Sequence, residues 1–380
     1  MLKSFVYFLI IAALFSSCIT VSNPSSKPLS YADNHRVVAY VTGWENNWGE
    51  HFEKAHQITH INYAFANIKD DRVVEGGTKD GPDLKKLNEL KKVNPKLKIL
   101  ISVGGWSWSG GFSDAVLTHE SREIFATSAI DYMLRHKIDG IDLDWEYPGL
   151  PGAGNTHRPE DKENFTAILK LLRTKLDSIG GKDQHFLLTI ASAASQRYLD
   201  HTEMDIAHQY LDFVNIMTYD YYTGGSPITG HHSNLFPSGN TNDRTSMSSS
   251  LAVEQHIKAG VPVEKIVLGV PFYGRYWIGT KAENNGLYQL SDGKRGSYSF
   301  KKIAAEMQDK DGFKMYWDST SMAPYLWRGE DGQFVTYENE RSLQFKVDYV
   351  KKNNLGGIMF WQFNADNDNL LKTIYYNLVR

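Results

Sequence analysis

Three acidic side chains spaced two residues apart are the feature of this sequence best suited to chemistry. They are Asp142, Asp144 and Glu146, and they begin within the apolar segment 138–145, which we predict to be a β-strand. Because side chains alternate faces along a strand, the three carboxyl groups should point to one side, roughly 6 to 7 Å apart. Carboxyl groups that close raise one another's pKa values and share protons, which suits general acid and base catalysis.

Two other interpretations of this acidic row are a metal site and a set of exposed charges. Carboxylates could bind Mg²⁺ or Ca²⁺, but the Tyr147-Pro148 pair that follows offers no further ligand. The adjacent His231 and His232 also suggest a metal, but neighbouring histidines should point apart, and no third ligand accompanies them. We therefore predict that both histidines are loop or rim residues, and we expect no metal ion and no other cofactor.

The composition is that of an ordinary globular protein. Of 380 residues, 41% are hydrophobic and 22% are charged, with 41 Lys and Arg against 44 Asp and Glu. The resulting net charge of −3 indicates no surface for nucleic acid. Aromatic residues make up 13% of the chain, which hints at flat surfaces for sugar rings, although a large core also uses aromatics.

The acidic strand is one of eight apolar segments that we predict to be strands. In chain order they are 37–43, 58–66, 98–103, 138–145, 186–192, 213–219, 266–272 and 357–363. Helical spacing of apolar residues predicts helices between them, over 83–93, 120–137, 161–179, 251–259 and 342–353. This alternation predicts an α/β fold, a (β/α)8 TIM barrel; a doubly wound open sheet is the competitor, and the lack of a GxGxxG turn after the first strand favours the barrel.

The segment between the seventh and eighth strands is much longer than one helix requires. A barrel of this type needs roughly 250 residues, and the predicted folded part, 35–380, is about 100 residues longer. Short aromatic segments separated by glycines predict a small sheet there, at 286–290, 296–300, 313–317 and 333–337, with one helix near 300–308. We therefore expect a small α+β insertion domain at 276–337.

The N-terminal segment predicts export. Residues 1–17 combine Lys3 with an apolar run and then small residues, as in a secretory signal peptide. Cys18 is the only cysteine, which excludes an internal disulfide, and the preceding Leu-Phe-Ser-Ser resembles a bacterial lipobox. We expect Cys18 to carry a lipid, 18–34 to form a tether, and the protein to be anchored to a membrane of the cell envelope by that lipid only. The alternative is an ordinary cleaved signal peptide and a secreted protein.

Five motifs in order along the chain resemble glycoside hydrolase family 18, the chitinase family. The family's SxGG motif matches Ser102, Gly104 and Gly105, and its DxxDxDxE motif matches Asp139, Asp142, Asp144 and Glu146. Its MxYD motif matches Met217, Thr218, Tyr219 and Asp220. The family's segment after the seventh strand matches Tyr273, Gly274 and Arg275, and its tryptophan on the eighth strand matches Trp361. The resemblance covers about 35–363. It implies the barrel and the subgroup with a deep groove, in which an α+β insertion forms one wall of the cleft.

This resemblance implies a substrate-assisted mechanism, in which the N-acetyl oxygen of the sugar attacks the anomeric carbon and the configuration is retained. Glu146 would be the general acid and base, and Asp144 would hold the acetamido N–H. Asp142 would store a proton, and Tyr219 would orient the acetamido oxygen. Asp139 and Gly140 would have structural roles in the motif.

The resemblance also implies a set of residues that bind the sugar chain. These are Tyr40, Phe65, Gly105, Trp106, Met217, Asp220, Tyr273, Arg275 and Trp361. The family has a cis peptide bond after the last of these, so we predict one between Trp361 and Gln362. Many members place a tryptophan about six residues after MxYD; this chain has 221–225 instead, so either Tyr222 compensates or the leaving-group side binds more weakly.

The expected function is that of a retaining chitinase acting on chitin or N-acetylglucosamine oligosaccharides, as a monomer. One alternative is an endo-β-N-acetylglucosaminidase that cuts N-glycans with the same acids. The other is a lectin-like protein with a weak or absent activity.

Overall fold

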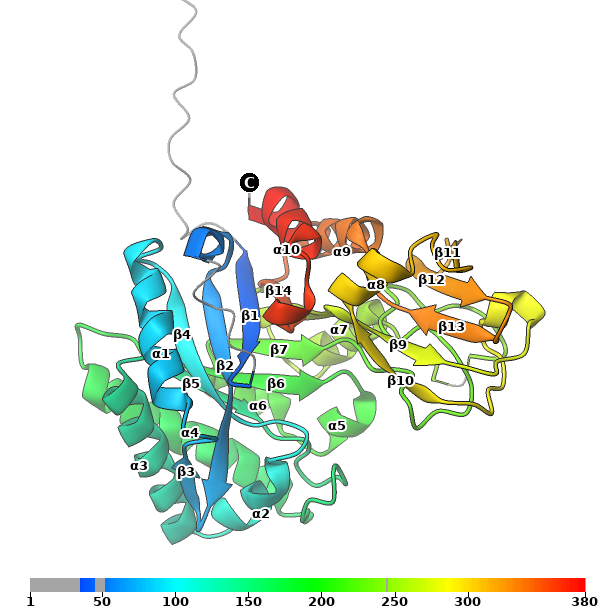
Figure 1. Cartoon of the computed structure of the whole chain (residues 1–380). Helices are drawn as coiled ribbons and strands as arrows, with labels where there is room; N and C mark the ends of the chain where they lie inside the picture. Colours follow the sequence, from blue (N-terminus) through cyan, green and yellow to red (C-terminus); the bar gives the residue numbers. More distant parts are fainter. Residues whose placement is uncertain (1–34, 45–51, 244, 380) are drawn as a thin grey trace, which may run out of the picture. The chain divides into compact units, whose positions relative to one another are not determined.

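The computed structural model describes residues 35–44, 52–243 and 245–379 (Figure 1). The expected signal peptide, the lipid site at Cys18 and the tether lie outside these residues, so they stay predictions.

Eight parallel strands close into a barrel, as the alternating pattern predicted. They are β1 (Arg36–Thr42), β2 (His60–Lys69), β4 (Lys98–Gly104), β5 (Gly140–Asp144), β6 (Leu187–Ala193), β7 (Phe213–Met217), β8 (Ile266–Pro271) and β14 (Gly357–Trp361). The first strand, β1, pairs with both β14 and β2, so the barrel has no free edge. An open doubly wound sheet is therefore excluded, because its first and last strands would not meet.

The longer helices lie close to their predicted positions. They are α1 (Asp80–Glu89), α3 (His119–His136), α4 (Asp161–Gly180), α7 (Ser249–Lys258) and α9 (Glu340–Lys352). Capping boxes start α3 at Thr118 and α9 at Asn339, which satisfies backbone N–H groups that a helix start leaves free. No helix in the described ranges is long and apolar enough to cross a membrane.

Several short elements were not predicted. They are α2 (Phe112–Ala115), α5 (Gln196–Asp200), α6 (Met204–Ala207), α10 (Asn369–Ile374) and β3 (Arg72–Val74), which forms a hairpin with β2. Each is shorter than the window over which hydrophobic periodicity can be recognised, which is why the sequence pattern did not reveal them.

The two faces of β5 have the chemistry that strand alternation predicts. Trp145, just after the strand, packs outside the barrel, where its ring stacks on Phe112 at 5.0 Å and meets the edge of Phe165 of α4 at 6.0 Å. The alternate residues point the other way: side chains of other strands contact Asp142 inside the barrel, and Asp144 lines the groove above it. The outer apolar layer thus holds β5 against the helices and leaves its acidic face to the interior.

An α+β insertion domain separates β8 from β14 along the chain, drawn in yellow and orange in Figure 1. Its elements are β9 (Tyr273–Trp277), β10 (Arg295–Ser299), α8 (Phe300–Glu306), β11 (Lys314–Asp318), β12 (Ala323–Arg328) and β13 (Gln333–Thr336). The strands form an antiparallel sheet in the order β10-β9-β13-β12-β11. The sheet already begins at Tyr273, because β9 follows β8 almost directly, and the predicted strand at 286–290 does not form.

The insertion has an aromatic core of its own. Trp277, Tyr288, Tyr325, Trp327 and Phe334 are buried together there. Since aromatic side chains bury large areas, this cluster explains how a sheet of short strands is held together. It also accounts for part of the aromatic content that the composition left open between core and sugar-binding surface.

Candidate active site

A groove of about 1270 Å³ lies at the carboxyl ends of the barrel strands. It is lined by most residues that the sequence analysis selected, namely Tyr40, Phe65, Trp106, Asp144, Glu146, Met217, Tyr219, Asp220, Tyr273, Arg275 and Trp361. Ser297, Tyr298, Ser299 and Lys301 of the insertion domain line it too. The carboxyl ends of barrel strands are where active sites of this fold lie, so this groove is the candidate active site.

Asp142 lies beneath the groove, fully buried in the barrel. Its Oδ2 accepts hydrogen bonds from Tyr40 Oη and Ser102 Oγ, both at 2.7 Å. Its Oδ1 accepts from Thr189 Oγ1 at 2.6 Å and from Asn215 Nδ2 at 3.4 Å. Burial raises the pKa of Asp142, while these donors stabilise its charged form and oppose that rise.

The donors Thr189 and Asn215 were not predicted from the sequence as residues of the site. Each is a polar residue at an inward position of a mostly apolar strand, β6 or β7, and each is fully buried. A buried polar side chain needs a partner, so these two positions carried a recognisable signal. The sequence did not show that both partners would be the same carboxylate.

Asp144 and Glu146 continue the acidic row to the floor of the groove. Burial and the neighbouring charges of Glu146 and Asp142 raise the pKa of Asp144 well above its usual range. Burial raises the pKa of Glu146 to about 7; a hydrogen bond with Tyr147 opposes this rise, and the charge of Asp220 adds to it. Glu146 is therefore a carboxyl group that can hold a proton near neutral pH, as a general acid must.

One carboxylate oxygen of the row has no partner. Within the described part of the chain, the buried Asp144 Oδ1 has no hydrogen-bond partner. The backbone around it is fixed by Ser109, whose Oγ accepts from the Glu146 N–H at 2.9 Å and lies 3.1 Å from the Asp144 carbonyl oxygen. Ser109 was not predicted, because nothing in its local pattern distinguishes it from a loop serine.

Aromatic rings surround the row. Trp361 stacks on Phe65 with centroids 5.6 Å apart, and its centroid is 5.7 Å from that of Tyr40. The ring of Tyr219 meets Tyr273 edge-on at 6.2 Å, and burial raises the pKa of Tyr219 well above its usual range, so its hydroxyl stays protonated. The peptide bond between Trp361 and Gln362 is cis, as predicted.

Two groove aromatics are strongly exposed. Trp106 is 53% exposed and Trp44 is 56% exposed, and both line the groove. Trp44 was not selected from the sequence; its ring centroid lies 6.5 Å from that of Trp361. Exposed indole faces along a groove are suited to stacking on sugar rings.

Asp220 and Arg275 form an ion pair in the groove wall. Arg275 donates from Nε to Asp220 Oδ1 at 2.8 Å and from Nη2 to Oδ2 at 2.6 Å. Burial would raise the pKa of Asp220, but the neighbouring His232 and Arg275 together hold it below its usual range. The sequence analysis placed both residues on the substrate side without predicting that they bind each other.

Gly105 and Gly140 of the motifs are needed because neighbouring groups leave no space for a side chain. Gly105 has a φ of 79°, and a Cβ there would lie 2.6 Å from the ring of Phe65. It is not among the residues that line the groove; its N–H donates to the Asp144 carbonyl at 2.8 Å. A Cβ at Gly140 would lie 2.4 Å from the Leu187 carbonyl oxygen, so this glycine allows β5 and β6 to approach closely.

Asp139 lies at the other end of β5, away from the groove. Its Oδ2 accepts from the Ile99 N–H at 2.8 Å, and it forms an ion pair with Lys91 at 2.7 Å. These contacts join the start of β5 to its neighbours.

Three residues of the loop after β7 are buried in a way that local sequence did not show. Tyr222 is buried against the insertion core and donates to Asp243 Oδ1 at 2.7 Å, so it does not line the groove in place of the missing tryptophan. His231 and His232 lie in this loop, one of the two predicted places, but they are buried rather than at its rim. His231 Nε2 lies 3.1 Å from Asp318 of the insertion, and His232 Nδ1 lies 3.6 Å from Asp220. The insertion covers these side chains, which local sequence could not show.

Comparisons with known proteins agree with this geometry. The model of glycosyl hydrolases family 18 matches residues 36–366. Chitinase A1 of Niallia circulans is 35% identical over 97% of this chain, which spans 62% of that protein. Chitinase B of Serratia marcescens is 30% identical over 83% of this chain and 74% of its own length.

A solved structure extends the likeness to three dimensions. The family 18 N-acetylglucosaminidase from Paenibacillus barengoltzii superimposes with a TM-score of 0.85 and 43% identity, over 91% of this chain and all of that one. With a barrel of matching topology and an acidic row at the carboxyl end of its strands, the chain belongs to family 18 of the glycosyl hydrolases.

Proposed function

We propose that this protein hydrolyses β-1,4 linkages between N-acetylglucosamine units in chitin or chitooligosaccharides, with retention of the anomeric configuration. The observation that carries the proposal is the pair formed by Glu146, protonated near neutral pH, and Asp144, whose buried Oδ1 is unpartnered among the described residues. A proton donor beside a free acceptor oxygen suits a sugar that offers a glycosidic oxygen and an acetamido N–H.

The residues support a substrate-assisted mechanism in steps. Glu146 protonates the glycosidic oxygen while the acetamido oxygen attacks the anomeric carbon, so an oxazolinium ion forms and the leaving sugar departs. Asp144 accepts a hydrogen bond from the acetamido N–H and offsets the positive charge of the oxazolinium ion, and Tyr219 orients the acetamido oxygen. Water then opens the oxazolinium with Glu146 as base, and the proton returns to Glu146.

Asp142 acts as the proton store of this cycle. With four donors around it, its charged form is stabilised inside the barrel. When Asp144 turns from Asp142 towards Glu146 and the substrate, a negative charge can stay behind on Asp142 at low cost. This division of roles needs no carboxylate nucleophile, but it does need a 2-acetamido group on the sugar that is cleaved.

A chain of sugars fits the groove better than a single one. Trp106 and Trp44 present exposed indole faces along it, and the insertion domain contributes one wall, as in the deep-groove subgroup. We expect the protein to act as a monomer, with chitin or its oligosaccharides as its partner and without a cofactor.

A second candidate is the release of single N-acetylglucosamine units. It is favoured by the 43% identity to a structure described as an N-acetylglucosaminidase. The two candidates share Glu146 and Asp144 and differ in the length of the product. Cleavage of N-glycans and lectin-like binding remain the further alternatives to be tested with the same protein.

The test is product analysis by mass spectrometry and early NMR with N-acetylglucosamine hexamer and, in parallel, a high-mannose glycopeptide. We expect β-anomeric dimer or trimer from the hexamer, and no product from the glycopeptide. Monomer as the first product would select the second candidate, glycan release would select N-glycan processing, and binding without cleavage would indicate a lectin. Glu146→Gln should abolish cleavage. Glu123→Gln should not, because Glu123 is a half-buried residue of α3 that pairs with Lys175 of α4.

We also infer that the protein is exported and held on a membrane of the cell envelope through a lipid on Cys18. The support is the sequence alone: an apolar leader, small residues and one cysteine at the expected cleavage point. A lipid with two or more acyl chains would anchor the protein stably.

A further inference from the structure

Asp220 is a groove residue outside β5 whose charge acts on the general acid. It follows β7, lines the groove, and raises the pKa of Glu146 by repulsion. Its backbone has a φ of 63°, a left-handed conformation that aspartate adopts more often than most other non-glycine residues. Arg275 binds its carboxylate from one side, and His232 faces it from another. The position of this carboxylate therefore depends on what lies behind it.

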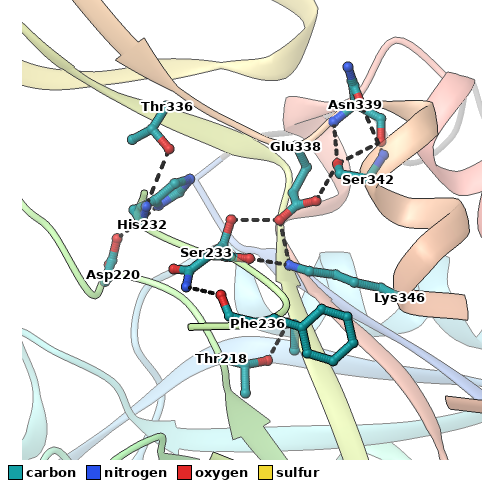
Figure 2. Close-up of polar contacts among 12 residues, drawn as sticks. Thr218, Asp220, His232, Ser233, Phe236, Thr336, Glu338, Asn339, Ser342 and Lys346 are labelled. Carbon is teal, nitrogen blue, oxygen red and sulfur yellow. Dashed lines mark hydrogen bonds and ion pairs between the residues drawn. The ribbon is translucent and has the colours of Figure 1, made fainter. Parts of the chain in front are cut away.

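His232 lies directly behind Asp220. The imidazole is fully buried and packs edge-on against Tyr273 at 5.4 Å. Its Nδ1 lies 3.6 Å from Asp220 Oδ1 (Figure 2). Burial lowers the pKa of His232, so the ring is neutral and directs a polar nitrogen at the carboxylate. Across the described residues, neither ring nitrogen has a hydrogen-bond partner, and Asp220 Oδ1 lies just beyond hydrogen-bond distance of Nδ1.

The backbone of His232 is held from both sides. Its N–H donates to Thr336 Oγ1 of β13 at 3.2 Å, and its carbonyl accepts from the Tyr221 N–H at 3.2 Å. The loop that carries His232 thus bridges the insertion domain and the residue that follows Asp220. A shift of this loop would move the imidazole and the carboxylate together.

The next residue, Ser233, is tied to a buried ion pair (Figure 2). Lys346 of α9 donates to the Ser233 carbonyl at 2.5 Å and to Glu338 Oε1 at 2.5 Å. Ser233 Oγ also donates to Glu338 Oε1 at 2.6 Å, and Ser342 Oγ donates to Oε2 at 2.6 Å. All four side chains are buried, so every charge in this cluster is paired inside the protein.

A buried ion pair of this kind is a weak source of stability. The cost of removing two charges from water roughly cancels their attraction, and apolar replacements of the same size are often as stable. A fully satisfied polar cluster does, however, hold its members in one geometry. Here the geometry held is that of the loop behind a groove carboxylate.

We propose that His232, fixed through Ser233 by the Lys346–Glu338 pair, is a positioning residue that holds Asp220 in place beside Glu146. This inference rests on the proposed function for its kinetic readout. We call this series of contacts, from Lys346 and Glu338 through Ser233 and His232 to Asp220, the relay. It leads from α9 through the loop after β7 to the groove, and none of His232, Glu338 and Lys346 lines the groove itself.

The charged surroundings determine what loss of the relay does. The titratable groups that face His232 are Asp220, Arg275, Tyr273 and Glu338. Those that face Glu146 are Asp144, Tyr147, Tyr198, Tyr219 and Asp220. Of these acidic neighbours of Glu146, only Asp220 contacts His232, so a freed Asp220 would repel the Glu146 carboxylate less and the Glu146 pKa would fall.

The test measures kcat/KM on the hexamer against pH for His232→Leu and His232→Asn. Because the Asn amide places a polar nitrogen near the position of Nδ1, Asn should preserve most of the activity. Leu should lower kcat/KM by about fivefold or more and move the alkaline limb to lower pH by about half a unit. His256→Leu is the matched control: His256 is as deeply buried, but it contacts Ser192 at 2.7 Å and not Asp220.

A second variant keeps the test decisive if His232→Leu does not fold. The double change Glu338→Gln with Lys346→Met removes the pair without leaving a buried charge alone. We expect the same direction of change in the pH profile, at a melting temperature close to that of the wild type. A pH profile unchanged in this variant, or a His232→Leu profile that matches the His256→Leu control, would overturn the inference.

Failure of the proposed function would be seen separately. If the wild type does not cleave the hexamer, the relay is tested by calorimetric binding of the hexamer to Glu146→Gln with and without His232→Leu. The added change should weaken binding about fivefold or more, because Asp220 and Arg275 line the groove. Equal binding by both proteins would overturn the inference without reference to catalysis.

Discussion

At the scale of single residues, the chemistry depends on a carboxyl group kept protonated by burial. Glu146 is almost fully buried, and its pKa is raised from near 4.5 to about 7. The folded protein therefore binds this proton more tightly than the unfolded chain does. The charge that forms above pH 7 is an energetic cost that the fold tolerates because the reaction needs a proton donor there.

Glu146→Gln should make the protein inactive and, at alkaline pH, more stable. Because the folded pKa lies above the unfolded one, wild-type stability falls as pH rises from about 4.5 through about 7, and a neutral Gln has no such loss. We expect the free energy of unfolding of the variant, relative to that of the wild type, to be about 1 to 3 kcal/mol higher at pH 8 than at pH 4, as measured by urea unfolding. A stability difference between the two proteins that does not vary with pH would show that Glu146 titrates normally.

At the scale of elements, strands far apart in sequence converge on one carboxylate. Tyr40 of β1, Ser102 of β4, Thr189 of β6 and Asn215 of β7 all donate to Asp142 of β5. The barrel closure brings these strands around one interior point, so each contributes one donor. No single strand could surround a carboxylate in this way.

Thr189→Val should lower kcat about tenfold or more, because it removes a 2.6 Å donor to the charged form of Asp142 while keeping the side-chain shape. Steady-state kinetics on the hexamer at neutral pH measures the effect. Ser128→Ala is the control, since its buried hydroxyl accepts the Val73 N–H at 2.9 Å away from the groove. A loss of melting temperature in both variants with kcat unchanged in Thr189→Val would leave Thr189 a purely structural role.

At the scale of the whole molecule, the insertion domain completes the site that the barrel begins. Its β9 carries Arg275, which binds Asp220 of the barrel, and the segment from Ser297 to Lys301 lines the groove. The same domain buries Tyr222 and His231, two residues that the local sequence placed at the surface or the groove. The groove wall and the relay behind Asp220 are therefore joint products of barrel and insertion.

Cys18→Ser should move the protein from the membrane fraction to the soluble fraction, because the lipid attaches through the thiol. Fractionation of cells that express the full chain, followed by immunoblotting, measures this. The wild type carries the matched thiol, and labelling with a fatty-acid analogue should mark it alone. A wild-type protein found unlabelled in the soluble fraction would favour an ordinary signal peptide and secretion.

The sequence by itself determined the alternation of strands and helices, the acidic row and the family motifs, and it favoured a barrel whose closure the pairing of β1 with β14 and β2 then established. Strand alternation and helix periodicity are local properties, so the eight strands and the inward direction of Asp142 and Asp144 could be derived from spacing. The motif also allowed the cis peptide after Trp361 to be predicted. The helices α2, α5, α6 and α10 were too short for such periodicity.

Only the tertiary structure decided which side chains contact one another. Thr189 and Asn215 could be recognised as polar residues in apolar strands, but their common partner Asp142 follows from barrel closure. His232 and Lys346 are separated by more than a hundred residues, and their connection exists because α9 and the loop after β7 pack together. Alternation states which side of a strand faces inward; the distance between two inward groups is a property of the closed fold.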